Sequence, residues 1–176
     1  MLDIARDARW GRIVEGAGED PYLGSAMAAA QVRGFQGDDL SDPERVLACA
    51  KHFAGYGYSE GGRDYDPVNL SETQLRNIVL PPFEAAVKAG VATFMSAYMD
   101  LNDVPASGNR WLLRQVLRKE WGFEGFVVSD AFAVANMVIQ GHARDRRDAA
   151  LRGIKAGLNM DMSSYTYTEG VVKLVK

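Results

Sequence analysis

The sequence is poor in the residues that form disulfides and metal sites. Its 176 residues include one cysteine and two histidines, so an intrachain disulfide is excluded. No spacing of His, Cys, Asp and Glu suits zinc, and no histidine is placed to serve Ser129 as a base. We therefore expect no metal, no cofactor and no serine triad. Cys49 lies in the apolar run 46–50, which predicts a small buried core residue.

Long hydrophobic runs are also missing. No segment approaches the ~20 continuous apolar residues of a membrane span, and residues 1–7 lack the basic start and apolar stretch of a signal peptide. The net charge is −3, and the Lys and Arg residues are scattered, so the sequence has no electrostatic footprint for nucleic acid. We expect neither a membrane nor a nucleic acid as partner.

The composition is that of a globular chain with a sizeable core. Hydrophobic residues make up 47% and charged residues 24% of the sequence, both close to ordinary values. The length suits one domain or a large part of one. Residues 1–7 read as the end of a strand, which is the first indication that a longer parent protein is truncated here.

Short apolar runs alternate with helical patterns along the chain. Asp20 followed by Pro21 predicts a helix start, with the end near Gly34 or Gly37. The predicted strands are Leu2–Ala5, Arg45–His52, Val91–Tyr98, Gly125–Asp130 and Leu158–Met162. The predicted helices begin at Asp20 and Ser71, restart at Phe83, and then cover Asn109–Glu120, Ala133–Gln140, Arg146–Ala156 and Thr168–Lys176. Alternation of strands and helices predicts a parallel α/β sheet. The long irregular stretch Ala54–Asn69 is typical of a functional loop.

Polar residues stand where several of these strands end. Lys51 and His52, Tyr98, and Asp130 close three of the predicted strands. In a (β/α)8 barrel the active site is built at the carboxyl ends of the strands, so the pattern favours a barrel enzyme with a carboxylate at its centre. Structural roles remain open for each residue taken alone: Asp130 as a helix cap, His52 as a satisfied histidine at the core edge, Tyr98 as packing, and Met95 as a core filler.

Five ordered motifs resemble glycoside hydrolase family 3. Residues 3–12 and 15–21 resemble D-x-x-R-D-P-R-W-G-R…E-x-x-G-E-D-P, and residues 51–57 resemble K-H-F-x-x-x-G. Residues 95–98 match M-S-A-Y, residues 127–130 end in the V-S-D of the nucleophile, and residues 157–162 also fit. The resemblance runs nearly end to end and is strongest to bacterial periplasmic β-glucosidases.

The resemblance implies a retaining β-glucosidase with a covalent glycosyl-enzyme. Asp130 falls on the family's nucleophile, while Arg12, Lys51, His52, Met95 and Tyr98 fall on positions that line or border the −1 sugar subsite. The substrate is then a β-glucoside or an oligosaccharide, and a β-xylosidase or another β-glycosidase of the family is the alternative. Ala131 departs from the family, which usually has Trp after the nucleophile. The loop after residue 53 lacks the histidine of the hexosaminidase branch.

The resemblance also implies that the chain is incomplete. It corresponds to a partial (β/α)8 TIM barrel, roughly strands 3 to 8, so residues 1–176 are expected to be an N-terminal barrel domain truncated at both ends. The acid/base glutamate of relatives lies in a second, C-terminal α/β domain, which is expected in the parent. We therefore expect the isolated chain to be inactive, or at most a weak sugar binder, and the parent to be periplasmic or secreted. An unrelated α/β binding domain is the alternative from another class.

Overall fold

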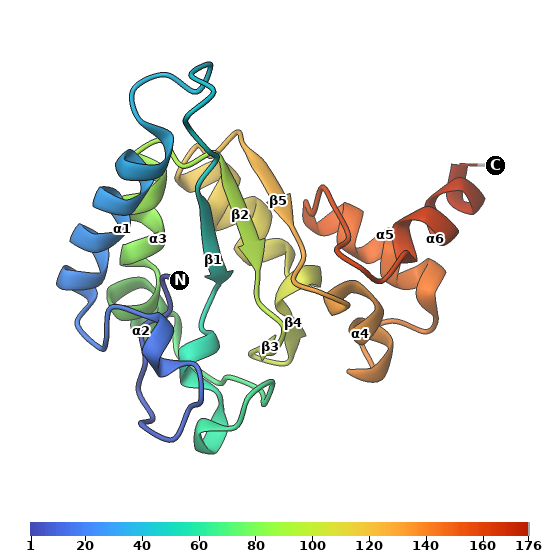
Figure 1. Ribbon diagram of the computed structural model, residues 1–176. Coiled ribbons are helices and arrows are strands. Elements are labelled where there is room, and N and C mark those ends of the chain that lie inside the picture. Colours follow the sequence, from blue (N-terminus) through green and yellow to red (C-terminus); the bar gives the residue numbers. More distant parts are fainter. Residues whose placement is uncertain (176) are drawn as a thin grey trace.

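A three-stranded parallel sheet forms the centre of the computed structural model, which describes residues 1–175 (Figure 1). The strands are β1 (Cys49–Phe53), β2 (Thr93–Ser96) and β5 (Phe126–Val128), in the spatial order β1-β2-β5. Ala50 pairs with Phe94, and Phe94 pairs with Val127, all in parallel register. This sheet and its connecting helices confirm the predicted α/β class.

Helices connect the strands and lie on both sides of them. The long helices are α1 (Pro21–Gln36), α3 (Pro81–Lys88), α4 (Ala133–Ile139), α5 (Arg146–Ala156), α6 (Thr166–Val175) and the π-helical η6 (Trp111–Glu120). Short turns of helix are η1 (Ile13–Glu15), η2 (Tyr56–Tyr58), η3 (Glu60–Gly62), α2 (Glu72–Gln74), η4 (Leu75–Val79) and η5 (Ala106–Gly108). Within residues 1–175, no helix has the length and apolar character needed to cross a membrane.

The start of α1 follows from its first residues. The Asp20 carboxylate accepts a hydrogen bond from Tyr22 N at 2.9 Å, and Pro21 occupies the first helical position, where its missing N–H costs nothing. The helix ends at Gly37, whose φ of 59° suits glycine. Both predicted helix signals are confirmed.

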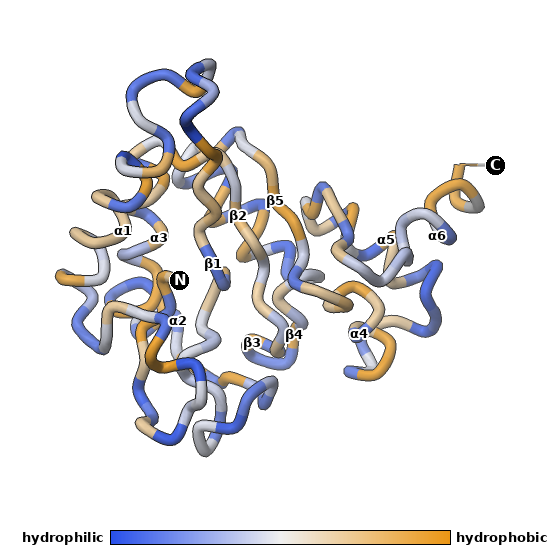
Figure 2. The backbone as a smooth tube through the Cα atoms, in the orientation of Figure 1, coloured by the Kyte–Doolittle hydropathy of each residue, from blue (hydrophilic) through white to orange (hydrophobic). Residues whose placement is uncertain are grey.

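The core lies between the sheet and the helices. α1 packs on α3, and α5 packs on both α4 and α6; in Figure 1, α1 and α3 lie beside β1, whereas α4, α5 and α6 lie beyond β5. Phe53 of β1 makes edge-on ring contacts with Phe83 of α3 and with Phe94 of β2, each at 5.2 Å. All three rings are fully buried, so they fasten α3 to the sheet. Figure 2 shows the same pattern, with hydrophobic strands at the centre and hydrophilic loops around them.

Two segments predicted as strands, 2–5 and 158–162, do not form regular strands in the structure. Segment 2–5 runs beside β1, and Leu2 N donates to Lys51 O, but the next β1 amide, His52 N, donates to the Asp3 carboxylate instead of a backbone carbonyl. Segment 158–162 makes a single parallel bridge, between Met160 and Val128. In both segments a side-chain oxygen takes the place of a ladder carbonyl; in the second it is Ser129 Oγ, which accepts from Met162 N at 2.9 Å.

A small hairpin was missed, and one buried residue was misplaced. Strands β3 (Asp100–Leu101) and β4 (Val104–Pro105) pair antiparallel around Asn102 and Asp103, which both have positive φ. Two such residues are the mark of a tight hairpin turn. Cys49 is exposed, contrary to the prediction, because β1 is the outermost strand of the ladder and Cys49 lies at its start, close to the exposed Val46 and Leu47.

One buried amide holds the starts of two strands. Gln36, the last residue of α1, accepts from Ala48 N at 3.1 Å and from Ala92 N at 2.9 Å through its Oε1 atom. Its Nε2 atom donates to Gly90 O at 2.9 Å. Gln36 therefore satisfies backbone groups just ahead of β1 and β2, where the parallel ladder has not yet begun.

Candidate active site

The predicted polar residues gather at the carboxyl ends of the parallel strands. Lys51 and His52 lie in the second half of β1, Tyr98 follows β2 by two residues, and Asp130 follows β5 by two residues. Because the three strands are parallel, their carboxyl ends lie together at one end of the sheet, below the strand arrows in Figure 1. Polar groups from three separate segments therefore converge, as expected for a barrel enzyme.

Asp130 presents a buried carboxylate with one uncommitted oxygen. The residue is 7% exposed, and its Oδ1 atom accepts from Ala131 N at 2.7 Å. Its Oδ2 atom lies 3.3 Å from His52 Nε2 and has no hydrogen bond of good geometry among the residues described. An oxygen held next to a nitrogen, yet not saturated with hydrogen bonds, is available to an incoming group.

The structure speaks against a capping role for Asp130. Helix α4 begins at Ala133, and its N-cap residue is Phe132, with no side-chain capping bond. The carbonyl of Asp130 accepts from Ala133 N, whereas its carboxylate bonds only the adjacent amide of Ala131. The position of this carboxylate thus has no explanation in the helix that follows.

His52 joins two carboxylates. Its Nδ1 atom lies 2.9 Å from Asp3 Oδ2, and its Nε2 atom faces Asp130. The imidazole is 1% exposed. A carboxylate at each ring nitrogen is more than a satisfied core histidine needs, so the arrangement favours a functional role.

Tyr98 lies beside the Asp130 carboxylate and contacts two further tyrosines. Tyr98 contacts Tyr65 edge-on at 5.0 Å and Tyr56 at 5.8 Å. Partial burial raises the pKa of the Tyr98 phenol, and the neighbouring negatively charged Asp130 carboxylate raises it further. Tyr98 therefore stays protonated at neutral pH and faces the carboxylate as a donor.

Arg12 reaches the same cluster from the N-terminal segment. Its guanidinium bonds both oxygens of Glu15, at 2.7 and 2.9 Å, and lies over the Tyr56 ring at 5.5 Å. The bond to Glu15 raises the pKa of Arg12, and the same bond lowers the pKa of Glu15. Both groups stay charged, and the positive charge of Arg12 is felt at Tyr98.

The positions of Lys51 and Met95 relative to Asp130 follow from charge effects and from strand register, and not from a direct contact with the carboxylate. Lys51 is half-buried, and its charge acts on Glu15 and on the N-terminal amine, which puts it in the region of Arg12 and His52. Met95 is half-buried on β2 and pairs in register with Val128, two residues before Asp130. Its register places it beside the strand that leads to the carboxylate.

Several residues at this edge were not predicted as site residues. Asp3 was noted only as part of a motif, yet it contacts His52. Tyr56 and Tyr65 lie in the long loop 54–69, which was singled out as functional without naming them. Phe132 follows Ala131, is 54% exposed and has a φ of 62°.

Residues 1–175 contain no group of three or more His, Cys, Asp or Glu side chains placed to hold a metal ion.

A parallel α/β fold with a buried carboxylate at the carboxyl ends of its strands is the arrangement of barrel enzymes, and the comparisons identify the family. The family model described as "Glycosyl hydrolase family 3 N terminal domain" matches residues 1–176. The chain belongs to this family.

Relatives and solved structures agree with this assignment. The chain is 43% identical over its full length to a periplasmic beta-glucosidase of Salmonella typhimurium, covering 23% of that protein. It is 46% identical over 166 residues, 92% of the chain, to a beta-xylosidase of Formosa agariphila, again covering 23% of that protein. The crystal structure of a beta-glucosidase from Listeria innocua in complex with isofagomine superposes with a TM-score of 0.97 at 42% identity, over 99% of this chain and 25% of that one. The chain thus spans about a quarter of the length of these proteins.

Proposed function

We propose that this chain supplies the nucleophile and part of the sugar site of a retaining β-glucosidase, with Asp130 as the nucleophile. The observation that carries the proposal is the Asp130 carboxylate itself: it is nine-tenths buried, lies at the strand ends, and has one oxygen uncommitted beside His52. In a retaining glycosidase such a carboxylate attacks the anomeric carbon and forms a covalent glycosyl-enzyme. The similar beta-glucosidases named above support the choice of glucose.

The neighbouring side chains suit the −1 sugar subsite. Lys51, His52 and Arg12 offer N–H donors to sugar hydroxyls. Tyr98 donates toward Asp130 or the ring region of the sugar. Met95 borders the subsite with an apolar surface.

A second carboxyl group must protonate the leaving oxygen, about 5–5.5 Å from the nucleophile. Asp3, the other carboxylate in contact with His52, is 2% exposed and lies across the imidazole from Asp130, so it cannot reach that oxygen. We propose that the acid/base lies in a further domain of the parent protein. We also propose that residues 1–176 are a truncated N-terminal barrel domain of that parent. That the chain spans about a quarter of its relatives supports this assignment.

An activated fluorosugar tests the nucleophile without requiring an acid. A 2-deoxy-2-fluoro-β-glucoside with a dinitrophenolate leaving group needs no protonation at departure, and its fluorine slows release of the covalent sugar. We expect intact-mass spectrometry of the chain to show one added fluoroglucosyl group, and peptide mapping to place it on Asp130. Asp130→Asn is the matched control and should stay unlabelled.

Two outcomes would contradict the proposal. Label on a different carboxylate would overturn the assignment of Asp130, and equal labelling of the Asp130→Asn variant would do the same. With p-nitrophenyl β-glucoside, whose leaving group benefits from an acid, we expect no turnover by the isolated chain. Turnover that is lost in Asp130→Ala would show that the chain is a complete catalyst and that the acid/base lies within it.

A β-xylosidase is the second candidate, because the beta-xylosidase relative is as similar as the beta-glucosidase relative. The two sugars differ by the hydroxymethyl group at C5. Labelling rates with the fluoroglucoside and the matching fluoroxyloside compare the two directly; a faster reaction with the xyloside would reverse our choice. From the similarity to a periplasmic relative, we propose a periplasmic or secreted location for the parent.

A further inference from the structure

The Asp3 carboxylate forms its hydrogen bonds with His52. Its Oδ2 atom accepts from the backbone N–H of His52 at 2.9 Å and lies 2.9 Å from the ring Nδ1 atom. Its Oδ1 atom has no hydrogen-bond partner among residues 1–175. The Asp3 side chain is fully buried and the imidazole is 1% exposed, so this pair lies behind the site, while the Asp130 end is the more open one.

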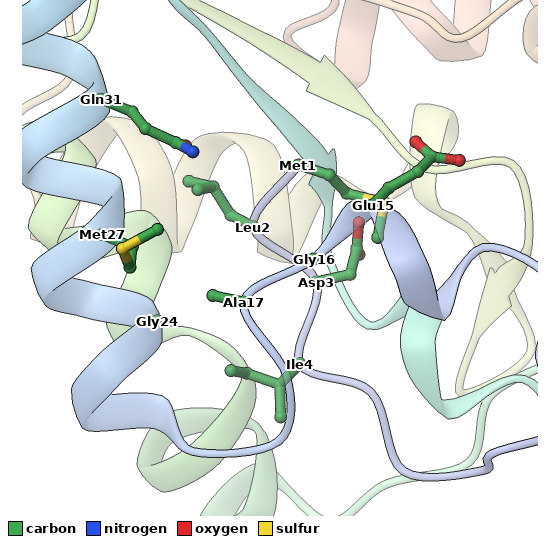
Figure 3. Close-up of a pocket in the computed structure, with 10 residues that line it drawn as sticks. All are labelled: Met1, Leu2, Asp3, Ile4, Glu15, Gly16, Ala17, Gly24, Met27 and Gln31. Atoms are coloured by element: carbon green, nitrogen blue, oxygen red, sulfur yellow. The ribbon is translucent and has the colours of Figure 1, made fainter.

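The N-terminal segment holds Asp3 in place from both sides. Leu2 N donates to Lys51 O, and Ala5 N donates to Gly18 O at 3.2 Å. Figure 3 shows Asp3 among the residues that line a small pocket, between the N-terminal strand-like segment and α1. A carboxylate fixed through its own backbone can hold the ring beside it in one orientation.

We propose that Asp3 is a positioning residue that acts through His52. It keeps a proton on Nδ1 and turns the ring so that Nε2 faces Asp130 and, on the basis of the proposed function, the sugar bound there. Ionised carboxylates only accept hydrogen bonds. With Asp3 at one nitrogen and Asp130 at the other, both contacts are attractive when both ring nitrogens carry protons.

Besides Asp3 and Asp130, the charged groups near the imidazole are Lys51, Glu15 and Arg12, of which the last two bond each other. In Ser-His-Asp triads, replacing the aspartate by asparagine leaves the imidazole in the wrong tautomer. The same change at position 3 should release the Nδ1 proton while the ring stays in place.

Nitrogen NMR of this chain tests the inference directly. The chain has two histidines, and a His142→Gln variant assigns their ring signals. We expect the Nδ1 nitrogen of His52, which lies 2.9 Å from Asp3 Oδ2, to resonate as protonated. In Asp3→Asn the Nδ1 signal should shift to that of an unprotonated nitrogen, whereas in Asp130→Asn it should remain protonated.

An unprotonated Nδ1 in the wild type, or an unchanged His52 spectrum in Asp3→Asn, would overturn the inference. Circular dichroism establishes that each variant is folded. Should Asp3→Asn not fold, Asp130→Asn decides: loss of the Nδ1 proton there would show that Asp130, and not Asp3, holds it. None of these readouts requires glycosidase activity, so failure of the fluorosugar labelling is distinguishable from failure of this inference.

Discussion

At the scale of single residues, the site depends on how closely the N-terminal segment approaches the loop after β1. A Cβ atom at Gly57 would overlap the backbone carbonyl of Ile4 and lie 3.1 Å from Ala5 Cα. Both obstacles are backbone atoms, so no side chain can rotate away. Gly57 is required for the contact that keeps Asp3 beside His52.

We expect Gly57→Ala to lower the free energy of unfolding by about 1–3 kcal/mol, the usual cost of overpacking. It should also disturb the His52 ring signals, because the segment carrying Asp3 must move. Urea denaturation followed by circular dichroism measures the first effect.

Gly11→Ala is the matched control, because nothing lies within 4 Å of a Cβ atom there. It should change stability by less than about 0.5 kcal/mol. Equal stability of the two variants would show that the approach at Gly57 is not as tight as the structure has it.

At the scale of elements, the start of α5 is held by a charge-assisted network. Asp148 is 8% exposed, and its carboxylate accepts from Arg144 N at 3.1 Å and from Arg152 Nε at 3.2 Å. The bond from the Arg144 backbone, followed by the bonds from the two arginine side chains, lowers the pKa of Asp148 below its ordinary 3.8. A lowered folded-state pKa stabilises the protein above that ordinary value, and the stabilisation is lost as the pH falls below it.

We therefore expect Asp148→Asn to cost about 1–3 kcal/mol at pH 7, the range for hydrogen bonds to charged groups. The difference from the wild type should shrink as the pH drops from 3.8 toward the lowered pKa. Urea melts at several pH values measure it, and Asp38→Asn, at an exposed aspartate, is the control. A difference that stays constant with pH would contradict the electrostatic account.

The elements also show what sequence reasoning reaches. The helix beginning at Asp20 and Pro21 follows local rules, so its start was predictable, and its end was predictable to one of two glycines, Gly34 or Gly37, of which the structure shows Gly37. The central strand residues of β1, β2 and β5 were predictable from their apolar runs. Segments 2–5 and 158–162 were not, because Asp3 and Ser129 side chains replace the backbone ladder there, and no local pattern signals that.

The site was predictable only in part, for a similar reason. Strand-end polarity and the family motifs brought together Asp130, His52 and Tyr98, whose proximity the structure shows. Asp3 reaches His52 across 49 positions in the sequence, and Tyr65 reaches Tyr98 through a folded loop. Such long-range contacts depend on the path of the chain, which composition and spacing do not contain.

At the scale of the whole molecule, one side of the sheet is poorly covered. β1 is an edge strand, and exposed apolar side chains surround it: Phe35 is 56% exposed, Val46 60% and Leu47 57%. Segment 2–5 pairs with the outer edge of β1 only in part, and an apolar surface beside an incompletely paired strand edge invites association.

We expect the purified chain to self-associate, and Phe35→Glu with Leu47→Glu to reduce the association. Sedimentation velocity over a range of concentrations measures it. Ile139→Glu is the control, since that residue is 85% exposed on α4, away from β1. A single monomeric species with a cooperative melting transition would contradict this prediction.

The bridge made by Gln36 has a practical consequence for engineering. Because one side chain anchors the starts of β1 and β2, the mainly hydrophilic connection 37–45 does not have to align those strands itself (Figure 2). It also lies at the opposite end of the sheet from Asp130 (Figure 1). This connection is therefore the natural place to open the chain for circular permutation or to insert a reporter domain, with the strand ends that carry Asp130 left untouched.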